Sequence, residues 1–532
     1  MSMCVRVSLI LSTIYDIIRR CLHAFVRAVV TPEEEKGQWI MEQLLTSRQQ
    51  TARQIKARFL EALQTNNVAE VLEILYTTNL DIDTVLEVED KRMVLASYKQ
   101  GFWLPDYKLE CSWAMALHVC VMYNYLETAL VLLQKGAAVN RKPNGKTPLH
   151  VACTVAHGDC VALLLGHGAR VNSLSLSGHT PLHYCITKES VECAKQLLLN
   201  GGDVNKPSQS KDEDTPLHTA ARLGIPELVA LYISHGAQVD AVNSLQETPL
   251  ITAAFWALDI REQTYSEDHH LVCRMLLDHG AGCFTKKDAN YITVYPLLVP
   301  DPNLYEDDYK TALHKASWNC DHVLMQMLLE AGADTTTMDI NGCEPIQYVL
   351  KVTSVRPMAI PELCYQLLLN FGAPRVYPPQ FHKVGETHRG QRRYPPQFHN
   401  VGETHGGQWR YPPEFHKVLQ ACHEYPNAVE VMMNSYERIK PTNKWRSSIP
   451  EASYKVAMWS LQYVSVLFLQ QHEEFYKSMF AVCSNTPRGL MHLARCAVRR
   501  AMENRCHTGV GTLPLPPPIQ RYLLLEPEGT FY

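Results

Sequence analysis

A group of histidines in the C-terminal half of the chain could bind a metal ion, because imidazole nitrogens are common ligands of transition metals. Its members are His382, His388, His399, His405, His416 and His423. No cysteine or carboxylate joins them at the spacing of a zinc site before Cys422. The segment also repeats itself, as YPPQFHKVGETH from Tyr377 and YPPQFHNVGETH from Tyr394, so duplication copies its histidines automatically. We therefore expect no metal site and no cofactor.

Motifs of covalent catalysis are absent from the sequence. There is no G-x-x-x-x-G-K-[ST] phosphate loop, no G-x-G-x-x-G turn, no H-E-x-x-H zinc motif and no Ser-His-Asp order. Cys422 and His423 are neighbours in sequence, which is not the geometry of a thiol nucleophile and its base. We therefore expect a protein that binds other proteins rather than an enzyme.

The C-terminal end contains the most specific binding signal. A helix is predicted over Thr486 to Cys506, with apolar and small residues on one side at helical spacing: Leu490, Leu493, Ala494, Ala497, Val498 and Ala501. Arginines occupy the rest of this helix, and we expect them to form a solvated face: Arg488, Arg495, Arg499 and Arg500. The run Leu513-Pro514-Leu515-Pro516 follows, and Tyr522 to Leu525 predicts an extended end. Such a helix can pack on its own domain or on a partner.

A motif with a period near 33 residues runs through the middle of the chain. Its copies begin with GKTPLHVAC at Gly145, GHTPLHYC at Gly178, EDTPLHTAA at Glu213 and QETPLITAA at Gln246. A second recurring segment precedes each copy, such as LLQKGAAVN ending at Asn140 and LLGHGARVN ending at Asn172. This is the ankyrin-repeat pattern, in which helical units stack and share one continuous core. We predict an all-α fold, an ankyrin-repeat solenoid followed by a small C-terminal helical domain.

Each letter of the repeated motif has a structural role. Thr147 is expected to cap a helix and Pro148 to fit the first helical position. His150 is expected to bond its own threonine and the neighbouring loop. The same roles fall to the corresponding residues of the next two copies, which are Thr180, Pro181, His183, Thr215, Pro216 and His218.

Domain boundaries follow from changes in these patterns. Residues 1–55 form a leader, and residues 56–109 contain an N-terminal capping ankyrin-like unit and an insert. About six ankyrin repeats occupy residues 110–374, with a further insert near 284–309. The remaining predicted segments are the Pro/His-rich duplicated linker at 375–418, a helical linker region at 419–482 and the C-terminal domain at 483–532.

Composition and charge exclude several kinds of partner. The 532-residue chain is 46% hydrophobic, with a formal net charge of −4, so neither nucleic acid nor a membrane is an expected partner. Its 17 cysteines are scattered, which favours reduced thiols and a cytoplasmic or also nuclear location. Residues 1–30 favour an amphipathic leader helix, with a mitochondrial transit peptide as the alternative. The apolar run Val456–Leu469 is shorter than the roughly 20 residues that a membrane span needs.

The C-terminal pattern resembles a SOCS box, which combines a proline-initiated helix of Leu-x-x-x-small-x-x-x-aliphatic spacing with Leu-Pro-Φ-Pro. With the repeats, the chain resembles the ankyrin repeat and SOCS box protein family from about Phe59 onward. The resemblance implies that elongin C is bound by Leu490, Leu493, Ala494 and Val498. It implies that cullin-5 is selected by Leu513, Pro514, Leu515 and Pro516. Ala494 stands where the family usually has a cysteine, and its loss of sulfur should weaken elongin binding somewhat.

The resemblance implies one function, and an alternative remains open beside it. In the first, the chain is the substrate-recognition subunit of a ubiquitin ligase. Its repeats bind a target, and its SOCS box recruits elongin B, elongin C and cullin-5 with a RING-box protein. In the alternative, it is an ankyrin scaffold that binds partners without ubiquitin transfer. Recovery of the elongins with the protein discriminates between them, whereas the sequence does not identify the target.

Overall fold

The computed structural model describes residues 50–89, 112–259, 262–282, 310–339, 343–353, 360–373, 415–437, 443–449, 475–481, 488–502 and 505–529. Most of the predicted leader, the insert near 284–309, the duplicated linker up to residue 414 and the apolar run 456–469 lie outside the described residues. The chain divides into two compact units. One contains the residues up to 151 together with 166–169, and the other contains 152–165 and the residues from 170 onward.

The first unit begins with helical residues 50–64 and α3 (Val68–Thr77). The side chain of Asn67 caps α3 by accepting a hydrogen bond from the backbone N–H of Glu70 at 3.2 Å. Strands β1 (Leu86–Val88) and β2 (Ser112–Ala114) pair antiparallel, with Leu86 opposite Ala114. Helices α5 (Ala116–Tyr123) and α6 (Leu126–Gln134) follow, and α7 (Pro148–Thr154) begins in this unit.

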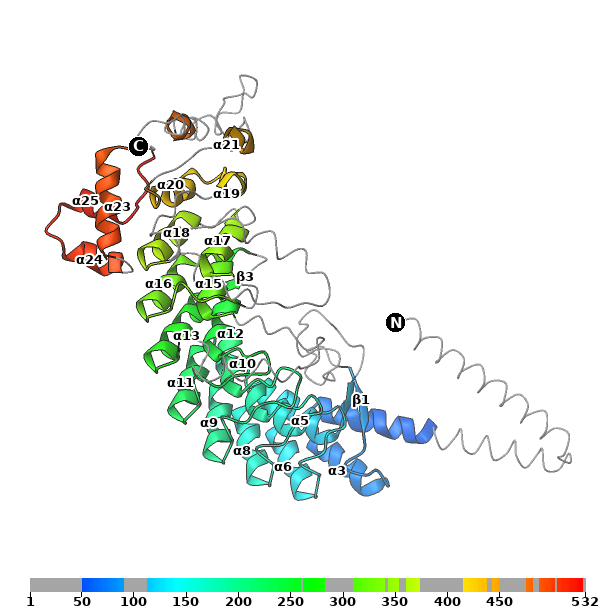
Figure 1. Ribbon diagram of the computed structural model, residues 1–532. Helices are drawn as coiled ribbons and strands as arrows, with labels where there is room; N and C mark the ends of the chain where they lie inside the picture. The colour runs from blue at the N-terminus through cyan, green and yellow to red at the C-terminus, as the bar shows by residue number, and fades with distance from the viewer. Residues whose placement is uncertain are drawn as a thin grey trace, which may run out of the picture. The chain divides into compact units, whose positions relative to one another are not determined.

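The second unit stacks its helices in two rows (Figure 1). One row lies nearer the loops of the Thr-Pro-Leu-His motif, and we call it the inner row. It contains α10 (Pro216–Leu223), α12 (Pro249–Trp256), α15 (Ala312–Asn319), α17 (Pro345–Thr353) and α19 (Phe415–Cys422). The outer row contains α9 (Val191–Leu199), α11 (Pro226–Ser234), α13 (Glu267–Asp278), α16 (His322–Glu330), α18 (Pro361–Asn370) and α20 (Pro426–Asn434). Helix α8 (Gly158–Gly166) precedes these rows in the chain. The described part of the chain is therefore mostly helical and forms an ankyrin-repeat solenoid.

The stack of helices goes on beyond Gly372, where the repeat pattern of the sequence becomes unrecognisable. Helix α19 packs on α17, and α20 packs on α18. Apolar residues on these last helices are fully buried, among them Leu419, Val429 and Met432. Burial of such side chains supplies the main stabilisation of a stacked pair. The domain boundaries proposed from the sequence stay predictions.

The Thr-Pro-Leu-His residues tie each turn to the next. In the third copy, Pro216 is the first residue of α10 and the Thr215 hydroxyl lies 2.8 Å from His218 Nδ1. His218 Nε2 then lies 3.0 Å from the backbone oxygen of Glu247, in the following loop. The corresponding threonine–histidine distances in the first two copies are 2.7 Å for Thr147–His150 and 2.8 Å for Thr180–His183. All nine predicted structural residues are buried.

The second copy of the motif departs from a regular α-helix. Residues Pro181–Tyr184 form a short 3-10 helix, η1, and Lys188–Ser190 form another, η2. At the start of η2 the Ser190 hydroxyl donates to the backbone oxygen of Thr187 at 2.6 Å, and the backbone N–H of Thr187 donates to Ser190 Oγ at 3.3 Å. Local side-chain bonds of this kind compete with helical hydrogen bonds, which explains the interruption.

Asparagines of the intervening loops join successive repeats. Asn172 Nδ2 donates to the backbone oxygen of Gly201 at 2.9 Å, and its Oδ1 accepts from the backbone N–H of Asp203 at 2.9 Å. Asn205 makes the same pair of bonds to Gly236 and Gln238, at 2.9 and 2.8 Å. Each amide therefore satisfies backbone groups that the tight loops leave without helical partners.

The buried histidines predict a loss of stability in acid. The ring of His314 lies 2.8 Å from the Thr311 hydroxyl and 3.0 Å from the backbone oxygen of Cys343, and burial lowers the pKa of His314 to about 4. An unfolded histidine has a pKa near ~6.5. As the pH falls from 6.5 towards 4, the unfolded chain binds the proton first, so this site should cost about 3 kcal/mol of folding stability.

Substitution His314→Gln should reduce this acid sensitivity. Glutamine fits the position, because Gln347 occupies it in α17 and its side-chain oxygen accepts from the backbone N–H of Glu344 at 3.2 Å. Urea unfolding at pH 6.5 and pH 4.5 measures the difference. The control His279→Gln, at an exposed position after α13, should lose as much stability in acid as the wild type. Equal loss of stability in acid in the two variants would contradict the assignment of acid sensitivity to the buried His314 ring.

The described chain ends in three helices that follow the solenoid. These are α23 (Leu490–Met502), α24 (Cys506–Thr512) and α25 (Pro517–Leu523); a short helix, α21 (Asn443–Ser448), lies earlier in the chain. The extended end expected at Tyr522 to Leu525 is wrong, because Tyr522 and Leu523 complete α25 and Leu524 and Leu525 form the turn after it. Pro517 occupies the first helical position, where its fixed φ and missing N–H are both tolerated. The leucine run therefore closes a helix, and Tyr522 and Leu523 are buried.

Candidate docking site on the C-terminal helices

Helix α23 exposes its apolar side and buries part of its basic side. Leu490 is 85% exposed, Met491 63% and Leu493 41%, and Ala494 is also exposed. Val498 is half-buried. The buried residues of the helix are His492, Arg495 and Cys496. The expected solvated arginine face is therefore wrong at Arg495, and the apolar stripe is the side that remains available for a partner.

Arg495 is buried because its cationic group has internal partners. Its guanidinium lies 4.1 Å from the centre of the Tyr522 ring, within cation–π range. One terminal nitrogen donates to His492 Nδ1 at 2.9 Å, and the other lies 3.4 Å from the backbone oxygen of Tyr522. Burial lowers the pKa of Arg495, while nearby Tyr522 and Glu430 oppose that shift. The arginine thus connects α23 to α25 instead of facing water.

The His492 ring accepts hydrogen bonds from two arginines at Nδ1 and bonds a backbone oxygen at Nε2. Its Nδ1 also accepts from Arg488 at 2.8 Å, and its Nε2 lies 2.9 Å from the backbone oxygen of Tyr436. Burial, with the charges of these arginines, lowers the pKa of His492 to about 3. The ring is therefore neutral near pH 7, with Nδ1 as acceptor and Nε2–H as donor. Arg488 also donates to Asn434 at the end of α20, at 2.9 Å.

Arg499 joins the C-terminal helices to the end of α18. One terminal nitrogen donates to Asn370 Oδ1 at 2.6 Å and to the backbone oxygen of Leu523 at 2.7 Å. The other donates to the backbone oxygen of Leu369 at 3.1 Å. The last carbonyl groups of a helix lack intrahelical donors and carry partial negative charge, which suits a guanidinium. The ring of His507 in α24 stacks on Phe371, with centroids 3.5 Å apart, beside this contact.

The segment after α25 is held by α18 and α20. Gln366 and Asn370 both donate side-chain N–H groups to the backbone oxygen of Leu524, at 3.0 and 2.9 Å. The buried carboxyl group of Glu430 accepts from the backbone N–H groups of Glu528 and Gly529 at 2.8 and 3.0 Å. Burial raises the pKa of Glu430 to about 7, against the opposing effect of these two hydrogen bonds. The three C-terminal helices are thus fastened to the solenoid at both ends.

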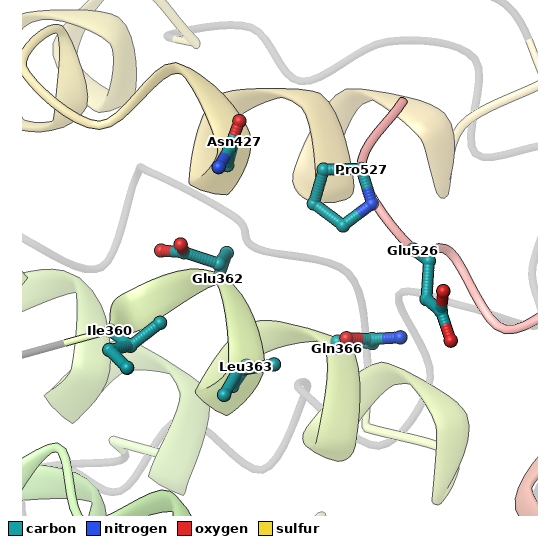
Figure 2. Close-up of a pocket in the computed structure, with 7 residues that line it drawn as sticks. All are labelled: Ile360, Glu362, Leu363, Gln366, Asn427, Glu526 and Pro527. Carbon is teal, nitrogen blue, oxygen red and sulfur yellow. The ribbon is translucent and has the colours of Figure 1, made fainter. Parts of the chain in front are cut away.

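A pocket of about 360 Å³ lies between α18, α20 and this segment (Figure 2). It is lined by Ile360, Glu362, Leu363, Gln366, Asn427, Glu526 and Pro527. Gln366 already uses its amide group on Leu524, and the two charged lining residues are both carboxylates. We assign no ligand to this pocket.

The Leu-Pro-Leu-Pro run forms a short ledge between α24 and α25. Pro514 and Pro516 are exposed, and Leu513 and Leu515 are half-buried. The side-chain amide of Gln520 donates to the backbone oxygens of Leu513 and Leu515, at 3.2 and 3.1 Å. Gln520 is not among the site residues predicted from the sequence. The available signal is an amide side chain in the first turn of the helix that follows a proline run, where it can reach back to the preceding carbonyl groups.

Neither a metal site nor a membrane span belongs to the described residues. They contain no group of three or more histidine, cysteine or acidic side chains placed to hold a metal. Of the histidine group weighed from the sequence, His423 is described with its side chain, and its Nδ1 lies 2.8 Å from the backbone oxygen of Gln420. In the same part of the chain, no helix combines the length and hydropathy needed to cross a bilayer.

Comparison with known proteins agrees with both halves of this architecture. The ankyrin-repeat family matches residues 117–208 and 191–288, and the SOCS box family matches residues 486–524. The latter range covers all of α23, α24 and α25, so the docking site coincides with the matched box.

Three curated relatives are similar along most of their length. Ankyrin repeat and SOCS box protein 16 of Mus musculus is 31% identical over 459 residues, covering 86% of this chain and 83% of the relative. Its Homo sapiens counterpart is 31% identical, with 88% and 86% covered. Ankyrin repeat and SOCS box protein 18 of Homo sapiens is 34% identical, with 81% and 77% covered. A particular closeness to ankyrin repeat and SOCS box protein 4, expected from stretches such as VLEVED and YLLLEPEG, stays a prediction. Identity at this level over most of both chains shows that the protein belongs to the ankyrin repeat and SOCS box protein family.

Proposed function

We propose that this protein is the substrate-recognition subunit of an elongin–cullin–RING ubiquitin ligase. Its SOCS box binds elongin C through the exposed side of α23, elongin B joins through elongin C, and cullin-5 with a RING-box protein completes the assembly. The ankyrin repeats bind the target. The chain performs no covalent step. It raises the local concentration of target lysines near the conjugating enzyme.

The exposed apolar side of α23 is the observation that carries this proposal. Leu490 is the most exposed large apolar residue described in the chain, at 85%. The residues from Leu490 to Val498 span about 12 Å along the helix, at ~1.5 Å per residue. A row of apolar side chains of this length suits the helix-in-groove mode of recognition. Because Arg495 and Arg499 already bind groups of this chain, rotating the helix to bury Leu490 would break those contacts.

The Leu-Pro-Leu-Pro ledge is the proposed cullin-5 contact. Its prolines restrict the backbone before binding, and Gln520 holds two of its carbonyl groups in place. Less conformational entropy is therefore lost when the ledge docks. The ledge would therefore form a second contact surface, separate from the elongin surface on α23.

The proposal also covers how the target is contacted and where in the cell the protein acts. The ankyrin units present their loops and inner helices to a protein whose identity the sequence does not reveal. A cytoplasmic or also nuclear location is proposed from the many reduced, buried cysteines.

Recombinant co-expression tests the proposal. The tagged full chain is produced with elongin B, elongin C, cullin-5 and a RING-box protein, and the proteins recovered on the tag are quantified. We expect stoichiometric recovery of both elongins and of cullin-5. Replacing Pro514 and Pro516 by alanine should reduce cullin-5 recovery and leave elongin recovery unchanged. If the elongins are never recovered, the ankyrin scaffold function stands instead.

A further inference from the structure

Exposed aromatic rings gather on two neighbouring helices of the inner row, α12 and α15. Helix α12 ends in Phe255 and Trp256, which are 38% and 51% exposed. Helix α15, which packs on α12, exposes 40% of Trp318. Tryptophan is the residue type most enriched at the energetic centres of protein interfaces. Large exposed rings on adjacent elements are therefore a reason to look for a partner here.

Ring and cation contacts connect these residues into one surface across α12, α15 and α17. The Phe255 and Trp256 rings meet edge to face at 5.6 Å, and Lys315 Nζ lies 4.7 Å from the Phe255 ring centre. Trp318 is one turn after Lys315 and lies 5.7 Å from the ring of Tyr348 in α17. Lys351 Nζ lies 4.6 Å from the same Tyr348 ring. We call this group the aromatic–lysine band: Phe255, Trp256, Lys315, Trp318, Tyr348 and Lys351, of which Tyr348 is buried beneath the others.

The helix ends that carry the band are fixed by hydrogen bonds. Asn319 Nδ2 donates to the backbone oxygens of Ala254 and Phe255 at 3.0 and 3.1 Å, which holds the end of α12 against the end of α15. The Tyr265 hydroxyl, from β4 (Thr264–Tyr265) of the hairpin with β3 (Leu258–Asp259), donates to the backbone oxygens of Asn319 and Cys320 at 3.1 and 2.9 Å. A surface held in this way needs little reordering when a partner binds.

The charges of the band favour a partner with a carboxylate. Lys315 is already paired with Glu247, at 2.7 Å, so its charge is largely balanced. Lys351 donates to the Cys343 sulfur at 3.4 Å, and among the described residues no carboxylate lies within ion-pair distance of it. Lys310 adds a second ammonium group 5.6 Å from the Tyr348 ring, and the Tyr348 hydroxyl donates to Asp339 at 2.5 Å. A carboxylate of the partner would therefore be stabilised most strongly at the α17 end of the band.

We infer that the aromatic–lysine band binds a segment of the target protein that carries a large apolar side chain followed closely by an acidic residue. The apolar side chain contacts Phe255, Trp256 and Trp318, and the carboxylate pairs with Lys351 beside Tyr348. This inference rests on the proposed function, since it describes how the repeats recognise a target. A second copy of the chain is the competing occupant, and the test below separates it.

Selection from a displayed library of random 12-residue peptides tests the inference. The bait is the full chain purified with elongin B and elongin C. We expect enriched peptides to combine an aromatic or leucine residue with aspartate or glutamate within a few positions. A selected peptide is then synthesised with a fluorophore, and its dissociation constant is measured by fluorescence anisotropy. The variant Trp318→Ala should weaken binding at least about tenfold.

A charge reversal makes the test specific. The variant Lys351→Glu should also bind the acidic peptide at least about tenfold more weakly than the wild type does. Replacing the acidic residue of the peptide by lysine should restore its binding to that variant. The control Val323→Ala, at an exposed apolar position of α16 in the outer row, should bind the peptide as the wild type does. No enrichment, enrichment of basic peptides, or unchanged affinity in both band variants would overturn the inference.

Two further readouts separate the inference from the proposed function and from self-association. Both band variants should still recover elongin C. Failure of peptide binding with elongin C retained overturns the inference alone, and failure to recover elongin C with the wild type overturns the proposed function. Sedimentation of the purified complex should show one copy of the chain, whereas a dimer that dissociates in Trp318→Ala would assign the band to a second copy and contradict the inference.

Discussion

Replacing Leu490 by aspartate is expected to weaken binding of the elongin B–elongin C dimer about a thousandfold, or about 4 kcal/mol. Leu490 projects from the first turn of α23 and is 85% exposed, so the free chain loses little when it is replaced. In the complex, the change removes a buried apolar side chain and also places a carboxylate in an apolar pocket, where its desolvation is costly. Titration calorimetry with purified full chain and elongin dimer measures the change.

A second exposed leucine provides the matched control. Leu199, the last residue of α9, is 70% exposed and lies in the outer row of the solenoid, away from α23 in the sequence and in packing. Leu199→Asp makes the same chemical change on the same kind of surface and should leave elongin affinity unchanged. Circular dichroism should report equal helix content in both variants. Equal affinity of the two variants would contradict the role of Leu490.

Arg499→Ala is expected to destabilise the packing of the three C-terminal helices on the solenoid by about 4 kcal/mol, since it leaves buried acceptors without a charged donor. The lost partners are Asn370 Oδ1 and the backbone oxygens of Leu369 and Leu523. Hydrogen–deuterium exchange of amides in α24 and α25 measures the effect, which should appear as exchange several hundredfold faster.

The neighbouring arginine is the control for that experiment. Arg500 has 66% of its side chain exposed and is paired with Glu437 at the surface. Exposed ion pairs contribute about 0–1 kcal/mol, so Arg500→Ala should change amide exchange only slightly. Equal effects of the two substitutions would mean that the contacts of Arg499 do not hold the box on α18.

The sequence predicts the solenoid well because its motif is local. Threonine, proline and histidine lie within four positions, and their cap, helix start and ring bonds need only the next loop. The same locality explains the apolar stripe of α23, where Leu490 and Ala494 follow from helical spacing. The second motif copy fails to give a regular helix because the Ser190 hydroxyl group bonds both the backbone N–H and the backbone oxygen of Thr187, and composition alone does not predict that these local bonds replace helical ones.

The internal role of the arginines could not be read from the pattern. Arg495 and Arg499 look solvated on a helical wheel because most of their partners, the Tyr522 ring, Asn370 Oδ1 and backbone oxygens, come from other elements that the wheel does not show. Leu369 lies 130 positions before Arg499, and the contact exists only because α18 ends beside α23. The aromatic–lysine band is missed for the same reason, since Phe255, Lys315 and Tyr348 meet only when three repeats stack.

Hydroxyl-radical footprinting of the full chain, alone and with the elongin B–elongin C dimer, tests the central claim most directly. The tryptic peptide from Gly489 to Arg495 contains the exposed Leu490 and Met491, and buried Met325 serves as internal reference. We predict rapid oxidation of this peptide in the free chain and strong protection once the dimer is added, with no change at Met325. Slow oxidation in the free chain, or no protection by the dimer, would contradict an available apolar face on α23 that binds elongin C.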